Sequence, residues 1–276
     1  MKNKVNPFLR YPLYIGDGPI LERLMVRLRR GYHKCLVCGE WARLDNIQGG
    51  DALRETAHCR KCNSTNRQRQ MAYTALHSVR PLSRLPIQSL KDFTKLRNFV
   101  VYNTEAAGPV HDALSKMDGY LCSYYYGDEY KSGETVNGIM HQDLQDLSFK
   151  DNSIDLVLSS DVFEHVADPY LAHREVHRVL KKNGKHIFTV PFHQLDYADD
   201  QRAVIEDGKL VYLKDPIFHG DPVSLRPEGA LVFNIFSLEM LVKLSAIGFR
   251  TNMFLLRLPK HGIMGHNAII FEAIKL

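Results

Sequence analysis

Short apolar runs alternate with amphipathic segments through most of the chain, beginning near residue 95. Strands are predicted for the apolar runs at 98–103, 120–125, 153–160, 185–192, 254–259 and 267–274. Helices are predicted at 108–117, 168–180 and 236–249. Nearly continuous apolar strands that alternate with helices are typical of a parallel sheet covered on both faces. The pattern therefore predicts an α/β domain over residues 96–276.

The segment 168–180 carries signals for a helix at both ends. Asp168 can cap the first turn, and Pro169 occupies the first helical position, where the missing N–H costs nothing. The sequence "KKNG", which ends at Gly184, is predicted to terminate the helix. His173 and His177 lie four residues apart but have no third metal ligand nearby in sequence, so we expect them on a solvated face.

Residues 193–230 interrupt this alternation between the strand at 185–192 and the last helix. The stretch is too long for an ordinary connection. Part of it, "EDGKLVYL", is predicted to form half of a hairpin. We therefore treat 193–230 as an insertion in the α/β domain.

Four of the five cysteines form two close pairs, Cys35 with Cys38 and Cys59 with Cys62. The spacing C-x2-C-x20-C-x2-C is that of a four-thiolate zinc site, because two cysteines in one tight turn can direct both sulfurs at one ion. Gly39 and Asn63 follow the pairs, and both tolerate the left-handed backbone that such turns need. Two disulfides are the alternative, which a cytosolic context disfavours. Four ligands leave no open position, so the predicted zinc is structural, and Cys122 is predicted to be a small buried hydrophobic residue.

The cysteines divide the first part of the chain into three segments. Residues 1–34 form an N-terminal lead-in with one short helix at 19–30, and 35–63 form the zinc ribbon. Residues 64–95 form a helical linker, in which a helix begins after Ser64 or Thr65 and a proline-containing stretch follows at 80–86.

Composition limits the environment of the protein. Of 276 residues, 45% are apolar and 24% are charged, and no run of eighteen apolar residues is present. The N-terminal stretch is basic but lacks the apolar core of a secretory signal. We therefore expect a cytoplasmic location and no membrane insertion; the sequence does not indicate an oligomeric state.

Charge is divided unevenly along the chain. Residues 1–91 contain seventeen Lys and Arg against six Asp and Glu, a net +11, whereas residues 92–276 contain nineteen against twenty-five, a net −6. A basic front and an acidic back indicate modules with different tasks. The front could bind a polyanion such as RNA or an acidic glycan, or it could be an ordinary solvated surface.

Residues 141–191, "HQDLQDLSFKDNSIDLVLSSDVFEHV" through "KHIFTVP", resemble the middle of class I S-adenosylmethionine-dependent methyltransferases of the ubiquinone-biosynthesis-like branch. The shared features are an acid ahead of a Leu-small-Phe turn, an "IDLV" strand, an acidic Glu-His segment and a helix followed by "KKNG". The resemblance implies a Rossmann-like doubly wound sheet, mostly parallel with an antiparallel last strand, preceded here by the zinc ribbon. It also implies S-adenosylmethionine as cofactor.

The resemblance implies cofactor contacts in four places. The turn after the first strand would approach the cofactor through Thr104, Glu105, Ala106 and Gly108. The family has three alternating glycines there, and this chain keeps only the last. Tyr124 occupies the position of the acid that binds the ribose hydroxyls, although it could instead pack in the core. Asp143 would accept from the adenine amine beside Leu144, and Asp161 would face the methionine end.

Asp161, Glu164 and His165 directly follow the strand at 153–160, where ligands bind in such sheets. Burying these groups unpaired is costly, so they either line a pocket or form a hydrogen-bonded turn. In this fold the insertion would cover the acceptor pocket, with contacts from His193, His219, Asp221 and Arg226. The candidates for a catalytic base are His165, His193 and His219.

We predict a methyltransferase that acts on a small-molecule or sugar acceptor. RNA is the alternative acceptor, because some ribosomal RNA guanine methyltransferases also pair a zinc module with this fold, but the basic front shows no evident aromatic platform for bases. A binding module that no longer turns over is a further alternative, which the replaced glycines suggest. A nicotinamide dehydrogenase is disfavoured, since "NTEAAGP" is not a G-x-G-x-x-G turn.

Overall fold

The computed structural model describes residues 13–16, 32–220, 228–265 and 269–276. The chain divides into two compact units. The first holds Met1–Phe99, Ala107–Tyr120 and Asn252–Glu272, and the second holds Val100–Ala106, Leu121–Thr251 and Ala273–Leu276. Strands β17 (Phe249–Arg257) and β18 (Ile269–Lys275) contribute residues to both units. The helix predicted at 19–30 lies outside the described residues.

The second unit is built on a mostly parallel sheet with the strand order β10-β9-β5-β6-β8-β7. Its strands are β5 Val101–Asn103, β6 Tyr120–Tyr124, β7 Thr135–Val136, β8 Ile139–His141, β9 Ile154–Ser160 and β10 Leu180–Thr189. β5 and β10 both pair with β9 in parallel, β6 pairs with β8 in parallel, and β7 is antiparallel to β8. Beyond β10 the order continues with β18, β17 and β1 (Leu13–Gly16). This arrangement confirms the predicted fold class.

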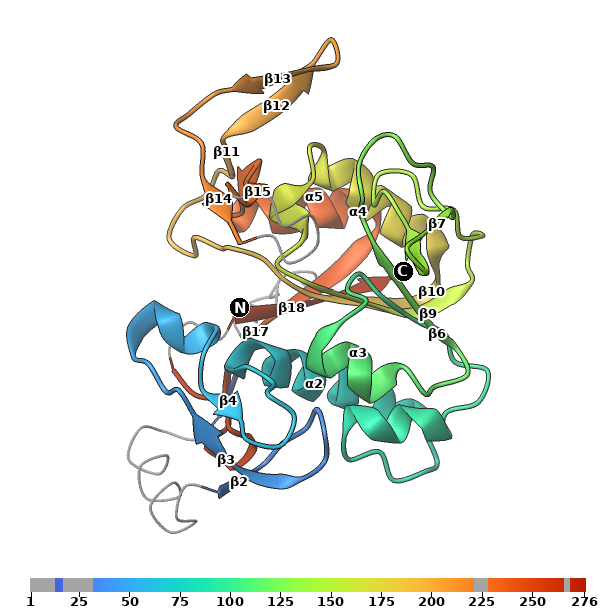
Figure 1. Cartoon of the computed structure of the whole chain (residues 1–276), viewed down its shortest axis with the longest axis vertical. Coiled ribbons are helices and arrows are strands. Elements are labelled where there is room, and N and C mark those ends of the chain that lie inside the picture. Colours follow the sequence, from blue (N-terminus) through green and yellow to red (C-terminus); the bar gives the residue numbers. More distant parts are fainter. Residues whose placement is uncertain (1–12, 17–31, 221–227, 266–268) are drawn as a thin grey trace, which may run out of the picture. The chain divides into compact units, whose positions relative to one another are not determined.

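Helices α4 (Pro169–Val179) and α5 (Leu238–Ile247) pack together over one face of these strands (Figure 1). Aromatic rings fill the space beneath them. The ring of His173 lies 4.3 Å from that of Phe163, and His186 stacks on Phe188 at 4.5 Å. Both histidines are fully buried, so the prediction that His173 lies on a solvated face was wrong. Its partner on the helix, His177, is half-buried.

The start of α4 follows from its sequence as predicted. A carboxylate oxygen of Asp168 accepts from the backbone N–H groups of Tyr170 and Leu171 at 3.0 and 2.8 Å. Pro169 occupies the first helical position. Two of the N–H groups that a helix leaves without an internal partner are thereby satisfied.

The end of α4 differs from the prediction. The helix ends at Val179, and Leu180 already begins β10, so the "KKNG" sequence does not terminate it. The pairing of β10 with β9 shifts register between Leu180 and Lys185. Gly184 permits this register shift, because a Cβ there would lie 2.7 Å from the carbonyl oxygen of Lys181.

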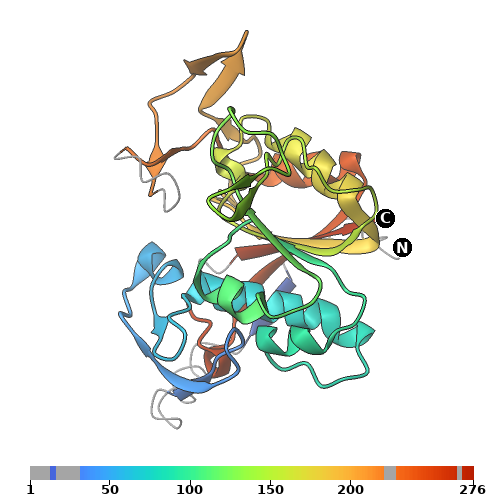
Figure 2. The same ribbon diagram turned by 45° about the vertical axis from the view of Figure 1, so that its right-hand side comes forward.

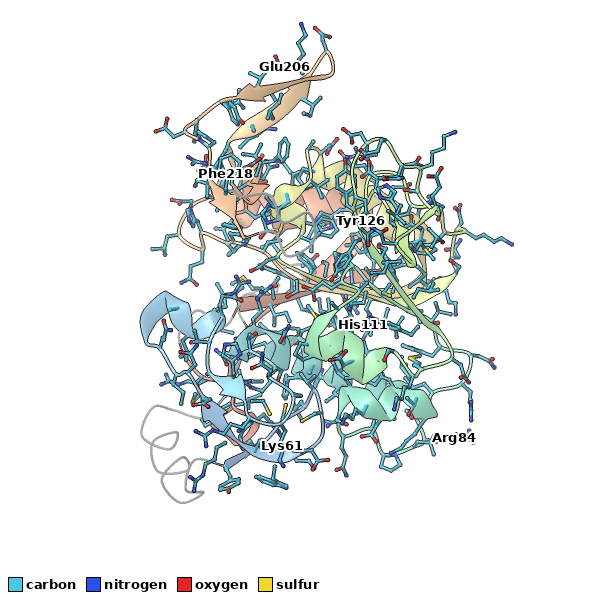
Figure 3. The ribbon with its side chains drawn as sticks, viewed as in Figure 1. Lys61, Arg84, His111, Tyr126, Glu206 and Phe218 are labelled. Atoms are coloured by element: carbon cyan, nitrogen blue, oxygen red, sulfur yellow. The ribbon has the colours of Figure 1, made fainter. Side chains whose placement is uncertain are left out.

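The insertion and the residues after it form pairs of short strands. These are β11 Asp200–Gln201, β12 Ala203–Glu206, β13 Lys209–Tyr212, β14 Phe218–His219, β15 Ala230–Leu231 and β16 Asn234–Ile235. β12 and β13 form the predicted hairpin, β14 pairs with β15, and β11 pairs with β16. Figure 2 shows the hairpin projecting away from α4 and α5. Figure 3 shows Glu206 near its tip and Phe218 on β14.

The first unit contains the cysteine-bearing sheet and two helices. β2 (Tyr32–Lys34), β3 (Trp41–Asp45) and β4 (His58–Cys59) form an antiparallel sheet, followed by helix α2 (Asn66–Val79) and the short helix α3 (Gly108–Leu114). The Thr65 hydroxyl accepts from the N–H of Gln68 at 3.3 Å, and the Gln68 side chain accepts from the N–H of Thr65 at 3.0 Å. This capping box confirms that a helix begins after Thr65.

Short 3-10 helices complete the described elements: η1 Gly50–Arg54, η2 Arg80–Leu82, η3 Leu90–Lys95, η4 Phe163–His165 and η5 Pro259–His261. In the described part of the chain, no helix has both the length and the apolar character needed to cross a membrane.

Candidate functional site

The strand order reverses between β5 and β9, and this reversal indicates where a ligand binds. β6 and β8 extend the sheet on the β5 side, and β10 extends it on the β9 side. In open parallel sheets, ligands bind beyond the carboxyl ends of the strands at such a switch point. The N–H of Thr104 donates to the carbonyl oxygen of Leu158 at 3.0 Å, so the loop that leaves β5 begins beside β9.

The loop after β5 holds four predicted cofactor residues, Thr104, Glu105, Ala106 and Gly108. Asn103 is buried, and its side-chain amide donates to the carbonyl oxygen of Glu105 at 2.8 Å, which fixes the turn at the strand end. Gly108 has φ +84, and the space where a Cβ would lie is open. The left-handed backbone, rather than crowding, therefore favours glycine at this position.

Tyr124 lies at the end of β6, with the backbone of Ala106 near its hydroxyl. Burial raises the pKa of Tyr124, and the nearby carboxylate of Glu105 raises it further. The hydroxyl is therefore neutral at physiological pH. Its contact with the ribose stays a prediction.

Asp143 follows β8 and lines a pocket of about 490 Å³. The rings of Tyr125, Tyr130 and His141 line the same pocket, and the His141 ring lies 5.4 Å from Tyr125 and 5.8 Å from Tyr130. Leu144 is buried beside Asp143. Aromatic faces next to a carboxylate suit a flat ring that carries an amine, since the ring can stack while the carboxylate accepts the N–H.

Asp161 directly follows β9 with a left-handed backbone, φ +52. Its N–H donates to the carbonyl oxygen of Thr189 at 3.0 Å, which joins the carboxyl ends of β9 and β10. Few residues with a Cβ adopt this conformation, and Asp and Asn are among those that tolerate it best. The turn therefore favours the residue type that the resemblance assigns to the cofactor.

Glu164, His165 and His219 form a cluster, which we call the Glu164 cluster. Glu164 is fully buried, and its Oε1 lies 3.8 Å from Nε2 of His165 and 3.8 Å from Nδ1 of His219. Nδ1 of His165 donates to the carbonyl oxygen of Leu231 at 2.8 Å. The backbone carbonyl of Glu164 also accepts from the N–H of Phe233 at 2.7 Å. Glu164 thus takes part in the turn through its backbone while its carboxylate faces two of the three predicted catalytic histidines.

The third predicted histidine, His193, lies apart from this cluster. Its side chain is 54% exposed, and its Nδ1 lies 3.5 Å from a carboxylate oxygen of Asp196. Asp221 and Arg226, the other expected acceptor contacts, lie outside the described residues. The structure therefore brings His165 and His219 together without His193.

A second pocket, of about 670 Å³, is lined by the start of α4, the insertion and α5, and sequence reasoning missed it. The hydroxyl of Tyr170 donates to Asp199, and the Lys243 amine lies 4.5 Å from the Tyr170 ring centroid. Burial raises the pKa of Tyr170, and the Asp199 carboxylate adds to this effect. These three residues lie on separate elements, so no local sequence signal could have grouped them.

The four paired cysteines lie together in the first unit. Their sulfurs all lie within 4.8 Å of one another, and those of Cys35 and Cys62 are 3.8 Å apart. Gly39 and Asn63 have φ +82 and +61, as the two turns require. The N–H of Gly39 donates to the carbonyl oxygen of Cys35 at 2.9 Å, and that of Asn63 to Cys59 at 2.7 Å. The two turns therefore share one geometry, and none of the five cysteines forms a disulfide.

Arg69 is fully buried near these cysteines. Its guanidinium donates to the carbonyl oxygen of Ala57 at 2.7 Å and to that of Gly262 at 3.1 and 2.9 Å. Burial lowers the pKa of Arg69 to about 10, and negative charge on the nearby sulfurs opposes this effect. The side chain therefore remains cationic at neutral pH and complements thiolates. Cys122, by contrast, is half-buried in β6, so it is less buried than the sequence predicted.

The strand order and the residues at the switch point define an α/β protein of the Rossmann-like methyltransferase class. The model of the family described as "Methyltransferase domain" matches residues 126–188. This range contains Asp143, Asp161 and two members of the Glu164 cluster. Residues 126–188 of the chain therefore match a methyltransferase domain.

The structure is similar to several solved methyltransferases. A protein from Mesorhizobium loti is 16% identical with a TM-score of 0.41, over 74% of this chain and 98% of that chain. One from Methanosarcina mazei is 17% identical with a TM-score of 0.38, over 66% and 94%. One from Aquifex aeolicus is 15% identical with a TM-score of 0.35, over 67% and 85%. A search of the curated proteins finds no match.

Proposed function

We propose that the protein transfers a methyl group from S-adenosylmethionine to a small-molecule or sugar acceptor, as in the ubiquinone-biosynthesis-like branch. The observation that carries the proposal is the aromatic pocket at Asp143, which adjoins β8 within the matched range. A pocket of this kind suits an adenine base. The resemblance assigns the same aspartate to that base.

The residues at the strand ends fit the remaining groups of the cofactor. The cofactor supplies a methyl group on a positively charged sulfur. A carboxylate at Asp161 would complement its cationic methionine end. The turned loop at 104–108 would hold the ribose region, with Tyr124 near Ala106 of that loop. Positioning supplies much of the rate in such a transfer, and a base is needed only where the acceptor loses a proton.

The depth of the Glu164 cluster supports a small acceptor. The side chain of Glu164 is 0% exposed, that of His165 is 21% exposed and that of His219 is 41% exposed. A hydroxyl on a small molecule can reach a site of this depth more readily than a group held within folded RNA. Either histidine could accept a proton from that hydroxyl.

Titration with S-adenosylhomocysteine by calorimetry tests the proposed function. We expect one site per chain, with binding weakened in Asp161→Asn, because asparagine keeps the left-handed turn but removes the charge. Asp161→Gly serves as a second variant that also tolerates the turn. The absence of binding by the folded wild-type chain at millimolar ligand would overturn the proposal.

We further propose that the four cysteines bind structural Zn²⁺ in a reducing compartment such as the cytoplasm. Ligands about 2.3 Å from a tetrahedral ion lie about 3.8 Å apart, which agrees with the 3.8 Å between the Cys35 and Cys62 sulfurs. Buried Arg69 would offset the surplus negative charge of four thiolates. Elemental analysis should find zinc, and Cys38→Ser should hold one Zn²⁺ per chain fewer than the wild type. Full zinc content in that variant would contradict the assignment.

A second candidate acceptor, RNA, is favoured by the exposed face of β2 and β3. Tyr32 pairs with Arg43 and Lys34 pairs with Trp41 across these strands. Tyr32 and Trp41 are 45% and 51% exposed, and the Arg43 guanidinium lies 5.0 Å from the Tyr32 ring centroid. The basic front therefore has exposed aromatic rings beside cations, which were not evident from the sequence. Exposed rings beside cations are the components with which proteins stack single-stranded bases.

Salt dependence separates the two acceptors. Binding of a fluorescent single-stranded RNA should weaken steeply with added salt, and Trp41→Ala should weaken it about tenfold, since stacking on one base contributes about 1–3 kcal/mol. Tyr197→Ala, which removes an exposed aromatic residue from the insertion, is the matched control. Equal RNA affinity of the Trp41 and Tyr197 variants would leave the small acceptor as the better assignment.

A further inference from the structure

We propose that the Glu164 cluster is a second metal site, which binds a divalent transition metal of the Zn²⁺ class through a carboxylate oxygen of Glu164, Nε2 of His165 and Nδ1 of His219. The site lies in the methyltransferase domain and is separate from the four-cysteine cluster, since the two share no residue. Its three protein ligands would leave at least one coordination position open, as in catalytic rather than structural zinc sites.

The distances are close to those of a metal site. The three ligand atoms lie within 4.8 Å of one another, and Glu164 Oε1 is 3.8 Å from each histidine nitrogen. Ligand atoms about 2.0–2.2 Å from one tetrahedral ion lie about 3.3 Å apart. Each of the two 3.8 Å distances would contract by about half an ångström, and the two histidine nitrogens, which lie within 4.8 Å of each other, would also approach through rotation of their side chains.

The hydrogen bond of His165 prepares the ring for a cation. A carbonyl oxygen only accepts, so Nδ1 must carry the hydrogen that it donates to Leu231 at 2.8 Å. In the neutral ring, Nε2 then presents its lone pair toward the Glu164 carboxylate, which also only accepts. A cation bound between these two groups, which lie 3.8 Å apart, would be contacted by both. A metal-bound histidine whose other nitrogen donates to a backbone carbonyl shows this same arrangement.

Burial and backbone geometry support the same assignment. Glu164 is fully buried, and a charge–charge interaction with a cation is stronger in a buried site than at the surface. His219 reaches the cluster from β14, whose pairing with β15 places it opposite Ala230. Gly229 permits this approach, because a Cβ at that position would lie 2.0 Å from the carbonyl oxygen of His219. The insertion is therefore built to bring His219 to the pair on η4.

The donor set selects the class of metal. Two imidazoles and one carboxylate suit zinc and neighbouring transition metals, whereas Mg²⁺ prefers oxygen ligands and keeps its waters. Four thiolates, by contrast, form a closed site. The two sites should therefore differ in their spectra when Co²⁺ is used as a probe, because only the cysteine site has sulfur-to-cobalt charge transfer.

A metal here would also prepare the acceptor, and this step rests on the proposed function. A cation lowers the pKa of an oxygen group that it binds. The acceptor hydroxyl would release its proton to solvent, and its oxygen would form a bond to the methyl carbon. The bond from that carbon to sulfur would break, with both electrons remaining on the sulfur as a neutral thioether. His165 and His219 would then act as ligands rather than as bases.

Zinc stoichiometry of the full chain tests the site. The wild-type chain should hold two Zn²⁺, and His219→Ala and Glu164→Gln should each hold one. His77→Ala, which removes an exposed histidine from α2, should retain two. Zinc can be removed from the weaker of the two sites and replaced there by Co²⁺. In the wild type this Co²⁺ should give visible absorption without sulfur charge transfer, and in the His219→Ala and Glu164→Gln chains it should give none. Because the His219 side chain is 41% exposed, its variant should fold even if the Glu164 variant does not.

Two results would overturn the proposal: one Zn²⁺ per wild-type chain, or two in a folded His219→Ala chain. S-adenosylhomocysteine binding, measured on the same samples, separates this proposal from the proposed function. Cofactor binding without a second metal would contradict the proposed metal site and support the proposed function. A second metal without cofactor binding would support the metal site and contradict the proposed function.

Discussion

The guanidinium of Arg69 donates twice to the carbonyl oxygen of Gly262, from Nε at 3.1 Å and from Nη2 at 2.9 Å. This contact joins helix α2 to the turn at η5, although 193 residues separate the two in sequence. Gly262 has φ +69, and a Cβ there would lie 3.0 Å from Arg69 Nε and 2.7 Å from the His33 ring. Glycine is therefore required both for the backbone and for the close approach of the arginine.

Arg69→Met should lower the free energy of unfolding by about 3 kcal/mol, because it leaves buried carbonyl groups without their charged donor. Urea unfolding followed by circular dichroism measures this loss. Arg60→Met is the matched control, since the Arg60 side chain is 56% exposed and pairs with Asp45 at 3.3 Å. Exposed pairs of this kind contribute about 0–1 kcal/mol. Equal midpoints for the two variants would contradict a structural role for Arg69.

Acid should destabilise the protein partly through His173. Burial lowers the pKa of His173 to about 3 in the folded state, below its ordinary value of 6.5. Between these values the unfolded chain binds more protons, so stability is full above pH 6.5 and is lost as the pH falls toward 3. The slope from this group is at most about 1.4 kcal/mol per pH unit.

His173→Leu should remove that part of the pH dependence. Leucine fills a similar volume, and within the described residues neither ring nitrogen of His173 has a hydrogen-bond partner to lose. Urea unfolding at pH 5 and pH 8 gives the slope, and His77→Leu, at an exposed position of α2, is the control. Fully buried His186, whose pKa burial also lowers, should leave a residual slope in the variant. An unchanged slope in His173→Leu would show that His173 does not titrate in this way.

The cap of α4 should contribute a smaller, local stabilisation. Asp168→Ala should lower the free energy of unfolding by about 1 kcal/mol, because two N–H groups of the first turn lose their acceptor. Asp168→Asn should cost much less, since its side-chain oxygen can still accept. Thermal or urea unfolding measures both. A cost for asparagine equal to that for alanine would assign the effect to charge rather than to the cap.

The features that were predictable from sequence are those set by neighbours in the chain. The caps at Thr65 and Asp168 and the turns at Gly39 and Asn63 depend on a few adjacent residues, and each was predicted correctly. The burial of His173 was not predictable, because polar spacing on a helix does not reveal which side chain faces the core.

The cluster of Glu164 with His219 shows why sites are harder to predict than elements. The sequence indicated the edge of the sheet at which Glu164 lies, but 55 residues separate it from His219. Their meeting depends on the pairing of β14 with β15 and on Gly229. The prediction that "KKNG" ends the helix was wrong for a related reason. Gly184 lies at the register shift between β10 and β9 and not at a helix end.

The aromatic pocket gives the most direct test of how the cofactor is held. Asp143→Asn should raise the Kd for S-adenosylhomocysteine about tenfold, because an amide accepts more weakly than a carboxylate and brings its own donor toward the adenine amine. Calorimetry measures the change. Asp207→Asn makes the same chemical change in the exposed turn between β12 and β13, where asparagine also tolerates φ +49, and should leave the Kd unaltered. If both variants bind as the wild type does, adenine is held elsewhere, and the rings of Tyr125 and Tyr130 enclose a pocket for another molecule.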